Sequence, residues 1–234
     1  MDRRYFLSLY GEEERKHIEE DLELGAEMAI ISCLPVVFRG SLPASDSLLL
    51  ASCGFSALTG EEMYISSLEA SLSGIEIISE ADAAGQLSVL KGAEDGEGRL
   101  HVVTSASLSS YISSYPQRAS RILLTGGSII STGMEKRNTR AAWSLSAFLS
   151  SHAFVAMMGY GWKEVLSMLD DGKDIAITRT SLTTHIGRTL ALEGCPVASS
   201  YSSAFPSRTG CIVYPSPEGQ FSFLDKRFDY LRLY

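Results

Sequence analysis

The second half of the chain alternates between strand-like and helix-like segments at short spacing, and this alternation constrains the fold more than any other feature. KDIAITR (173–179) is apolar and β-branched, TSLTTHIGRTLALEG (180–194) has helical spacing and ends at a glycine, and CPVASSY (195–201) is again strand-like. Strands joined through helices pair in parallel and are covered by those helices. The sequence therefore predicts an α/β fold, with a mixed sheet and helices on both faces.

The remaining segments divide into helices, strands and loops. Helical spacing predicts helices at 11–24, 48–58, 139–151 and 161–172, and Ser45 or Asp46 is expected to cap the second of these. Apolar, β-branched or alternating runs predict a strand or hairpin at 28–40 and strands at 74–79, 99–105 and 220–224. The polar, glycine-rich segment 81–98 predicts a loop, and the serine-rich segment 105–120 a helix or a loop.

Composition and charge narrow the classes of function. The 234 residues are 45% hydrophobic and 21% charged, which is ordinary for a globular protein, and the net charge is −8. Residues 1–100 hold 19 acidic and 7 basic side chains, whereas residues 101–234 hold 9 acidic and 13 basic ones. The acidic half argues against general nucleic-acid binding, while the basic half suits a small anion. With no bilayer-length apolar run and no secretory pattern at the N-terminus, we expect a cytoplasmic protein without a membrane partner.

Three segments that we expect at strand ends are rich in glycine or hydroxyl groups. They are Thr125-Gly126-Gly127 after the apolar run RILL, Thr178–Ser181, and Ser199–Ser203. Ligands of open α/β sheets bind at the carboxyl ends of strands, where glycines admit a ligand to the backbone and free N–H groups bind anions. Arg179 adds a charge, and a basic cluster lies between Arg118 and Arg140. These features predict a small-anion or nucleotide-like site, although helix capping, a simple backbone reversal and a solvated basic face are the structural alternatives.

Several familiar catalytic and cofactor patterns are absent from the sequence. There is no GxGxxG, GxxxxGK[ST], HExxH or GxSxG motif, so a dinucleotide site, a P-loop, a zinc protease and a nucleophile elbow are not supported. The four cysteines form no CxxC pair and are expected to be free thiols rather than zinc ligands or disulfides: Cys33, Cys53, Cys195 and Cys211.

The order of the C-terminal pieces resembles the formate dehydrogenase accessory protein (FdhD/NarQ) family. The resemblance rests on the run IAITRTSLTTHIGRTLALEGCPVASSYSSAFPSR. Arg179 aligns with the arginine of the family's Ser-Gly-Arg, and residues 194–197 align with its Gly-x-Pro-Val strand. Ser203-Ala204 aligns with the start of its Ser-Ala-Pro-Thr turn. Thr125-Gly126-Gly127 falls on its Thr-Gly-Gly, and Gly54-Phe55 on the Gly-Phe pair of its first helix. The resemblance covers about two thirds of the chain.

The resemblance implies a cytidine-deaminase-like α/β domain at 105–234, a smaller α+β domain at 1–104, and a homodimer. It implies transfer of sulfur from a cysteine desulfurase to the bis-guanine-dinucleotide form of the molybdenum cofactor, and delivery of that cofactor to formate dehydrogenase. The ligand would then be this cofactor or a guanine nucleotide, with no protein-bound zinc. Residues and resemblance together give these candidate cofactor-binding residues: Thr125, Gly126, Gly127, Arg137, Arg179, Thr180, Ser202 and Ser203.

One departure from the family bears directly on function. The family carries sulfur on a Cys-x-x-Cys loop before Thr-Gly-Gly, but this chain reads HVVTSASLSSYIS there, and serine cannot replace a thiolate. We therefore expect an accessory or carrier protein that binds an anionic, nucleotide-bearing ligand. Two alternatives stay open: an interaction protein that kept the fold and lost the ligand, and sulfur transfer moved to another cysteine, with Cys53 the first candidate.

Overall fold

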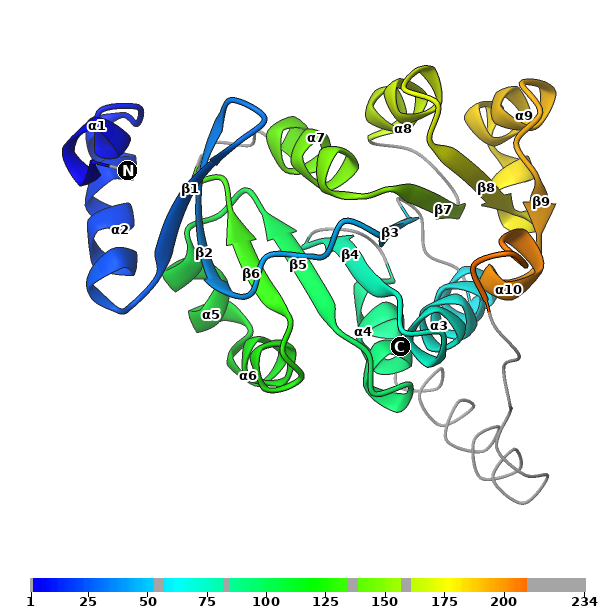
Figure 1. The fold of residues 1–234 in the computed structure, drawn as a ribbon, viewed down its shortest axis with the longest axis horizontal. Coiled ribbons are helices and arrows are strands. Elements are labelled where there is room, and N and C mark those ends of the chain that lie inside the picture. Colours follow the sequence, from blue (N-terminus) through cyan, green and yellow to red (C-terminus); the bar gives the residue numbers. More distant parts are fainter. Residues whose placement is uncertain (1, 53–56, 82–84, 134–138, 157–160, 210–234) are drawn as a thin grey trace.

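A computed structural model of the chain describes residues 2–52, 57–81, 85–133, 139–156 and 161–209. Its centre is one nine-stranded sheet in the order β1-β2-β6-β5-β4-β3-β7-β8-β9 (Figure 1). The strands from β3 to β9 run parallel, whereas β2 pairs antiparallel with both β1 and β6. The predicted α/β class with a mixed sheet is therefore confirmed.

The strands are short and alternate with the helices along the chain. The strands are β1 (Glu27–Ile31), β2 (Leu34–Gly40), β3 (Ser47–Ser52), β4 (Glu76–Glu80), β5 (Leu100–Thr104), β6 (Ser128–Ser131), β7 (His152–Ala156), β8 (Asp174–Thr178) and β9 (Val197–Ala198). The helices are α1 (Arg3–Leu7), α2 (Glu12–Glu23), α3 (Ala57–Leu72), α4 (Gln86–Asp95), α5 (Leu108–Ser114), α6 (Pro116–Leu124), α7 (Thr139–Leu149), α8 (Trp162–Asp170), a 3₁₀ turn η1 (Arg179–Thr183), α9 (His185–Leu192) and α10 (Tyr201–Ala204).

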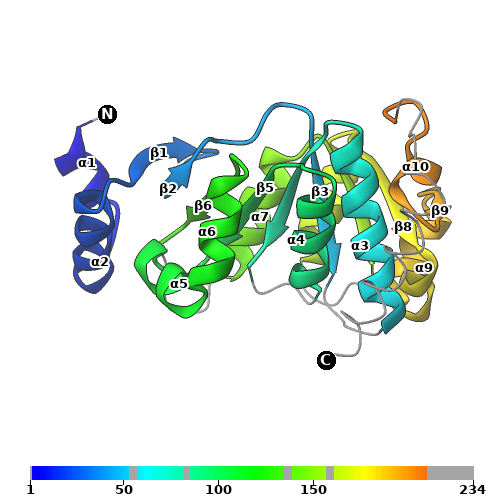
Figure 2. The same ribbon diagram turned by 90° about the horizontal axis from the view of Figure 1, so that it is seen from below.

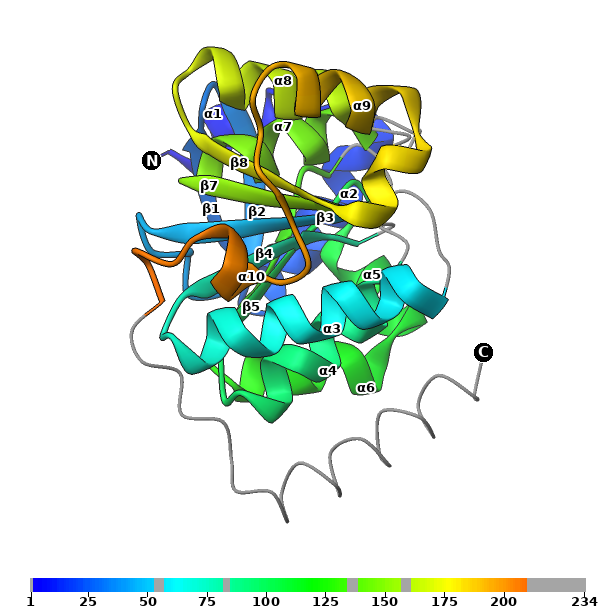
Figure 3. The same ribbon diagram turned by 90° about the vertical axis from the view of Figure 1, so that its right-hand side faces the viewer.

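Helices cover both faces of the sheet, so the central strands are apolar on both sides. Figure 3 shows α7, α8 and α9 on one face and α3, α4 and α6 on the other. In β3, Leu48 and Leu50 pack into the core on the α3 face, and Leu49 and Ala51 into the core on the α7 face. A strand buried on both faces needs a continuous apolar run rather than an alternating one. This requirement explains why SLLLAS forms a strand.

The N-terminal helices α1 and α2 pack at the β1–β2 end of the sheet (Figure 2). Asp21 of α2 is buried, and its carboxylate accepts hydrogen bonds from the backbone N–H groups of Leu108 and Ser109 at 3.0 and 2.8 Å. A carboxylate suits the positive N-terminal end of α5. The contact fastens α2 to the helix that follows β5.

Most of the predicted elements are present. Helices at 11–24, 139–151 and 161–172, the hairpin at 28–40 and strands at 74–79 and 99–105 are confirmed, and the segment 180–194 forms η1 and α9. The segment 195–201 contributes only the two residues of β9, and the serine-rich segment 105–120 is helical in α5 and the start of α6. The predicted strand at 220–224 lies outside the described residues.

Three predictions were wrong. The apolar run 48–52 is strand β3 rather than a helix capped by Ser45 or Asp46, and the segment 86–95 is helix α4 rather than loop. RILL (121–124), predicted to be a strand, is the last turn of α6. The first and third errors share a cause, because a short apolar run fits a buried strand and a buried helix equally well.

The boundary expected at residues 104 and 105 falls between β5 and β6, which pair with each other. Strands β3, β4 and β5 of the first segment stand between β6 and β7 of the second. One apolar cluster also joins Phe6 and Val37 to Phe154 and Phe205. Within the described residues, neither segment therefore forms a sheet of its own.

Candidate functional site

The strand order reverses at β3. The chain moves from β3 through α3 to β4 on one side, and it returns after β6 through α7 to β7 on the other. In open α/β sheets, ligands bind outside the carboxyl ends of the strands at such a reversal. We call the carboxyl ends of β3 and β7 the switch point. The side of the sheet where β3 to β9 end is the carboxyl edge, and the side where they begin is the amino edge.

A cluster of hydroxyl groups and one carboxylate lies beside the switch point. The Thr178 and Thr180 hydroxyls are 2.7 Å apart, and the Thr180 hydroxyl donates to the carboxylate of Glu62 on α3. The Ser181 hydroxyl lies 3.3 Å from that of Thr178 and donates to the Val155 carbonyl of β7 at 2.7 Å. The cluster therefore joins β7, β8 and α3 above the ends of the strands.

One cation adjoins this cluster in sequence. Arg179 opens η1 directly after β8 and is exposed. A separate ion pair, Arg140 near the start of α7 and Glu164 in the first turn of α8, is 3.4 Å apart (Nε to Oε1) and belongs to the groove between those helices rather than to the cluster. A cation, a carboxylate and several hydroxyls together suit a ligand that has both negative charge and hydrogen-bond donors.

Among the described residues, the groups that follow β4 and β6 at the carboxyl edge contact the protein's own side chains. Gly133 follows β6, and a Cβ there would lie 3.0 Å from side-chain atoms of Tyr10 and Ile18 in the N-terminal segment. After β4, the Gln86 amide donates to the Glu80 carbonyl at 3.4 Å and accepts from the Arg118 guanidinium at 2.5 Å. The polar groups next to β4 and β6 therefore serve packing, and the switch point remains the better candidate.

Two of the predicted site residues lie beside the switch point, and others do not. Arg179 and Thr180 follow β8 at the carboxyl edge, as expected. Glu62 is the residue that sequence reasoning missed. It lies in the second turn of α3, 118 residues before Thr180, and no motif marks it.

Thr125, Gly126 and Gly127 lie at the amino edge, where they end α6 and lead into β6. The backbone N–H groups of Gly126 and Gly127 donate to the carbonyls of Leu123 and Ile122 at 3.2 and 3.0 Å, and Gly126 has a φ of +82°. This arrangement is the Schellman motif that ends many helices. A side chain at Gly127 would collide with the Leu100 carbonyl. The two glycines are therefore explained by the backbone reversal, and they do not line the switch point.

Ser202 and Ser203 also lie away from the switch point. The backbone N–H of Ser202 donates to Glu69, in the C-terminal half of α3, at 2.8 Å. Its neighbour Tyr201 contacts His152, the first residue of β7. Ser203 donates its hydroxyl to the Ser200 carbonyl at 2.9 Å as a local cap. The last predicted site residue, Arg137, lies outside the described residues.

Neither described cysteine is placed as a sulfur carrier at the switch point. Cys33 is exposed in the β1–β2 turn, and Cys195 is buried before β9. Burial raises the pKa of the Cys195 thiol, with Glu193 adding to the effect, so the reactive thiolate is disfavoured there. Cys53 and Cys211 lie outside the described residues.

A groove of about 320 Å³ runs between α7 and α8 on the outer surface. Cations and anions both line it, among them Arg140, Glu164 and Lys173. The Lys173 ammonium already donates to the Ala147 and Ser150 carbonyls, each at 2.8 Å, which caps the end of α7. The groove thus lies away from the strand ends and offers less free positive charge than its composition suggests.

The described ranges show no features of a metal site or of a membrane-spanning helix. They contain no cluster of His, Cys, Asp and Glu side chains that would hold a metal ion. No helix among them is both long and apolar enough to cross a bilayer.

Solved structures with a similar backbone establish the fold. DNA processing protein A from Streptococcus pneumoniae matches with a TM-score of 0.59 at 13% identity, over 75% of this chain and 66% of that one. DNA processing protein A from Helicobacter pylori, solved for its single-stranded DNA binding mode, matches with a TM-score of 0.55 at 12% identity, over 74% of this chain and 90% of that one. At these identities the matches show a shared α/β fold and nothing about ligands.

A molybdenum cofactor carrier protein from Chlamydomonas reinhardtii also matches, with a TM-score of 0.47 at 16% identity, over 69% of this chain and 95% of that one. This likeness is too weak to bear on function. No protein-family model matches the chain, and no curated protein matches it. The resemblance to formate dehydrogenase accessory proteins therefore stays a prediction.

Proposed function

We propose that this protein binds a phosphate-bearing ligand of nucleotide type at the switch point and acts as an accessory or carrier protein. The observation that carries the proposal is the reversal of strand order at β3, with a hydroxyl and carboxylate cluster directly beside it. The reversal supplies the location that α/β sheets use for ligands. The cluster and Arg179 supply groups that recognise one.

The chemistry of the cluster selects among anionic ligands. Arg179 suits a phosphate group, because a guanidinium donates two parallel hydrogen bonds to it. The Glu62 carboxylate only accepts hydrogen bonds, and it disfavours a bare polyanion. A guanine base or a ribose supplies the donors that Glu62 accepts. We therefore propose a nucleotide rather than inorganic phosphate or pyrophosphate, with the bis-guanine-dinucleotide form of the molybdenum cofactor as the specific ligand that the family resemblance implies.

The partners implied by the resemblance are formate dehydrogenase and a cysteine desulfurase, and we keep both, with a homodimer, as proposals. Sulfur transfer is left out, because the chain lacks the Cys-x-x-Cys loop and burial disfavours the Cys195 thiolate. Single-stranded DNA is a second class of ligand, but a net charge of −8 opposes binding to a polyanionic strand.

Calorimetric titration with GDP tests the proposal, with a matched pair of arginine variants. Arg179→Gln removes the cation beside the switch point and is expected to weaken GDP binding by about tenfold, as for loss of a charged hydrogen bond. Arg121→Gln removes an exposed cation on α6, four residues before the sequence-predicted Thr125, and is expected to leave affinity unchanged.

Three outcomes would count against the proposal. No binding of GDP at millimolar concentration, and none of the molybdenum cofactor, would favour an interaction protein that lost its ligand. Equal binding of GDP and pyrophosphate would remove the role given to Glu62. Binding of labelled oligothymidylate at physiological salt in preference to GDP would assign the protein to the single-stranded DNA binders instead.

A further inference from the structure

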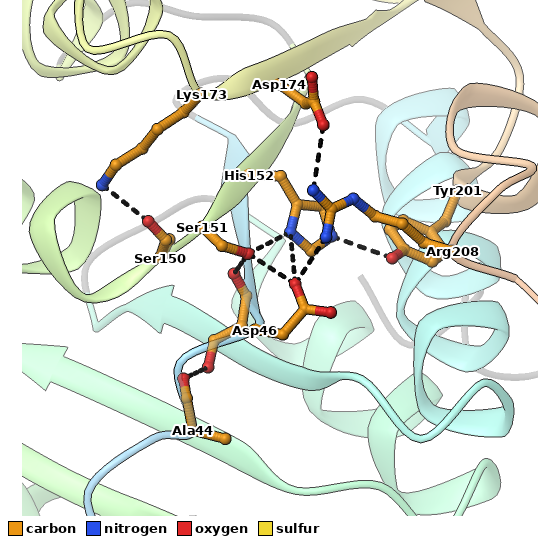
Figure 4. A network of polar contacts seen from close by, with 10 residues as sticks. Ala44, Asp46, Ser150, Ser151, His152, Lys173, Asp174, Tyr201 and Arg208 are labelled. Carbon is orange, nitrogen blue, oxygen red and sulfur yellow. Dashed lines mark hydrogen bonds and ion pairs between the residues drawn. The ribbon is translucent and has the colours of Figure 1, made fainter.

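A buried histidine at the amino edge connects the C-terminal part of the described chain to three strands. His152 begins β7 and has no exposed surface. Figure 4 shows its ring between Ser151 and Tyr201, with Asp46 and Arg208 close by. The rings of Tyr201 and Phe205 pack around it, with centroids 5.7 and 5.1 Å from that of His152.

The polar contacts of these residues form a chain rather than a set of isolated pairs. The Tyr201 hydroxyl lies 2.9 Å from His152 Nε2, and the Ser151 hydroxyl lies 2.7 Å from His152 Nδ1. The Ser151 hydroxyl in turn lies 2.8 Å from Asp46 Oδ1. The chain thus leads from a buried phenol to a carboxylate, whose side chain is 54% exposed.

Counting protons fixes the direction of every hydrogen bond in the chain. The Asp46 carboxylate only accepts, so the Ser151 hydroxyl donates its single proton toward it at 2.8 Å, with the Ser47 carbonyl as a longer second acceptor at 3.3 Å. Ser151 then accepts from His152, which requires the proton of a neutral imidazole to sit on Nδ1. His152 Nε2 is left as an acceptor, and the Tyr201 hydroxyl donates to it. The reverse direction would leave two oxygens 2.8 Å apart, those of Ser151 and Asp46, with no proton between them.

A guanidinium closes the chain at its carboxylate end. Arg208 donates to Asp46 Oδ1 at 2.7 Å and to Asp174 Oδ2, at the start of β8, at 3.0 Å. Asp46 directly precedes β3, so residues 201–208 are tied to the beginnings of β3, β7 and β8. Ser47, the first residue of β3, also links β3 to the residue before β7, because its carbonyl accepts the backbone N–H of Ser151 at 2.9 Å.

We propose that Tyr201, His152, Ser151 and Asp46 form a one-directional hydrogen-bond relay, which together with Arg208 acts as an acid-released latch for residues 201–209. A proton added to His152 must go to Nε2, which is the only acceptor the ring has left. Tyr201 can then no longer donate to the ring and its hydroxyl must turn to accept from the new Nε2–H, while a cation is created in a site without solvent.

The charges that face His152 are those of Arg208, which opposes the added proton, and of Asp46 and Asp174, which favour it. Burial is the largest influence and Arg208 the next, and they hold the pKa of His152 at about 4. Tyr201 stays protonated over this pH range and adds no charge of its own, because burial raises the pKa of its hydroxyl. The latch is therefore closed at neutral pH and opens as the pH falls toward 4.

Nitrogen NMR of protein with ¹⁵N-labelled histidine tests the direction of the relay. The signal of His152, assigned by its loss in His152→Gln, is expected to show a neutral ring protonated on Nδ1 at pH 7. In solution, histidine prefers the proton on Nε2, so the expected result differs from the default. A ring protonated on Nε2, or a charged ring at pH 7, would overturn the relay.

Amide hydrogen exchange tests the latch. The N–H groups of Phe205 and Thr209 donate to the carbonyls of Tyr201 and Phe205, so they report on this segment, and the N–H of Arg188 in α9 is the internal control. Protection of Phe205 and Thr209 is expected to fall as His152 titrates, while that of Arg188 holds. Unchanged protection of Phe205 and Thr209 through the titration would overturn the latch.

A matched pair of tyrosine variants completes the test at neutral pH. Tyr201→Phe keeps the ring but removes the hydroxyl, and it is expected to lower protection of Phe205 and Thr209 by about tenfold, as for loss of one buried hydrogen bond. Tyr64→Phe removes a hydroxyl that contacts Asp95 at 2.8 Å, outside the relay, and should leave this protection unchanged. Equal behaviour of the two variants would contradict the proposal.

Discussion

The two edges of the sheet use polar residues in different ways. At the amino edge, polar groups are buried and bound to one another: His152 by Ser151 and Tyr201, and His101 by Ser128 at 2.8 Å and Glu76 at 3.2 Å. At the carboxyl edge beside the switch point, Arg179 is exposed, and Glu62 and Thr180 are half-buried. Among the described residues, polar groups at both edges bind one another, but only the carboxyl edge adds the exposed Arg179 beside half-buried hydroxyl and carboxylate groups, so it has a free cation to offer a ligand.

The largest expected effect concerns the turn at the amino edge. Gly127→Ala should lower the free energy of unfolding by about 4 kcal/mol, because the added Cβ collides with the Leu100 carbonyl, which is backbone and cannot move aside. Gly172→Ala is the matched control, since its surroundings are open and only its φ of +74° is strained, at about 1–2 kcal/mol. Urea unfolding of both variants measures the difference. Equal costs would show that Gly127 is not required for packing.

The second-largest expected effect is the pH dependence that His152, at the amino edge, gives to the free energy of unfolding. Its pKa is about 4 in the folded protein and about 6.5 when unfolded, so the unfolded state binds more protons between these values. This contribution to stability is complete above pH 6.5 and falls by about 3 kcal/mol as the pH drops to 4. Unfolding of wild type and His152→Gln across this range isolates it. A variant with the same pH dependence as wild type would contradict the assignment.

A substitution at the carboxyl edge is expected to affect stability less than the changes at Gly127 and His152, and to affect ligand binding as well. Thr180→Val removes the hydroxyl that donates to Glu62 and should cost about 1 kcal/mol of stability, while GDP binding weakens about tenfold. Thr125→Val, at the sequence-predicted site, removes a hydroxyl that contacts the Ile122 carbonyl at 3.0 Å and should leave GDP binding unchanged. Calorimetry of the pair decides which edge binds, and a loss confined to Thr125→Val would reverse the assignment.

The smallest effect is expected for Arg121→Gln. The side chain is 61% exposed and its Nε lies 3.6 Å from Glu94, so the ion pair is screened by solvent and contributes at most about 0.5 kcal/mol. Thermal unfolding should show almost no change. A large loss of stability would mean that the basic cluster near Thr125 has a structural role that the contacts do not reveal.

Much of the fold was predictable from the sequence because strand and helix patterns alternate clearly after residue 139. The failures have physical causes. SLLLAS is buried on both faces, so its run of leucines lacks the alternation that marks a half-buried strand. The glycines of segment 81–98 favour a loop, yet Gly92 lies inside α4, where a Cβ would meet the Tyr64 carbonyl of α3.

The candidate site was predictable only where a residue directly follows a strand, as Arg179 and Thr180 do. Glu62 comes from a helix far away in sequence, and only the fold brings it to Thr180. The expected position of Thr125-Gly126-Gly127 at a strand end is wrong, because RILL ends helix α6 and the glycines follow a helix rather than a strand. A helix that leads into a parallel strand ends at the amino edge of the sheet, whereas a strand ends at the carboxyl edge. The residue types of RILLTGG alone do not tell these two cases apart.

Amide NMR during titration with GDP tests the central claim most directly, because it reports on both edges in one experiment. If the carboxyl edge binds the ligand, the backbone signals of Glu62, Thr180 and Ser181 shift in proportion to bound GDP, and those of Gly126 and Gly127 stay in place. Shifts centred on Gly126 and Gly127, or no shifts at millimolar GDP, would contradict the assignment of the ligand site to the switch point.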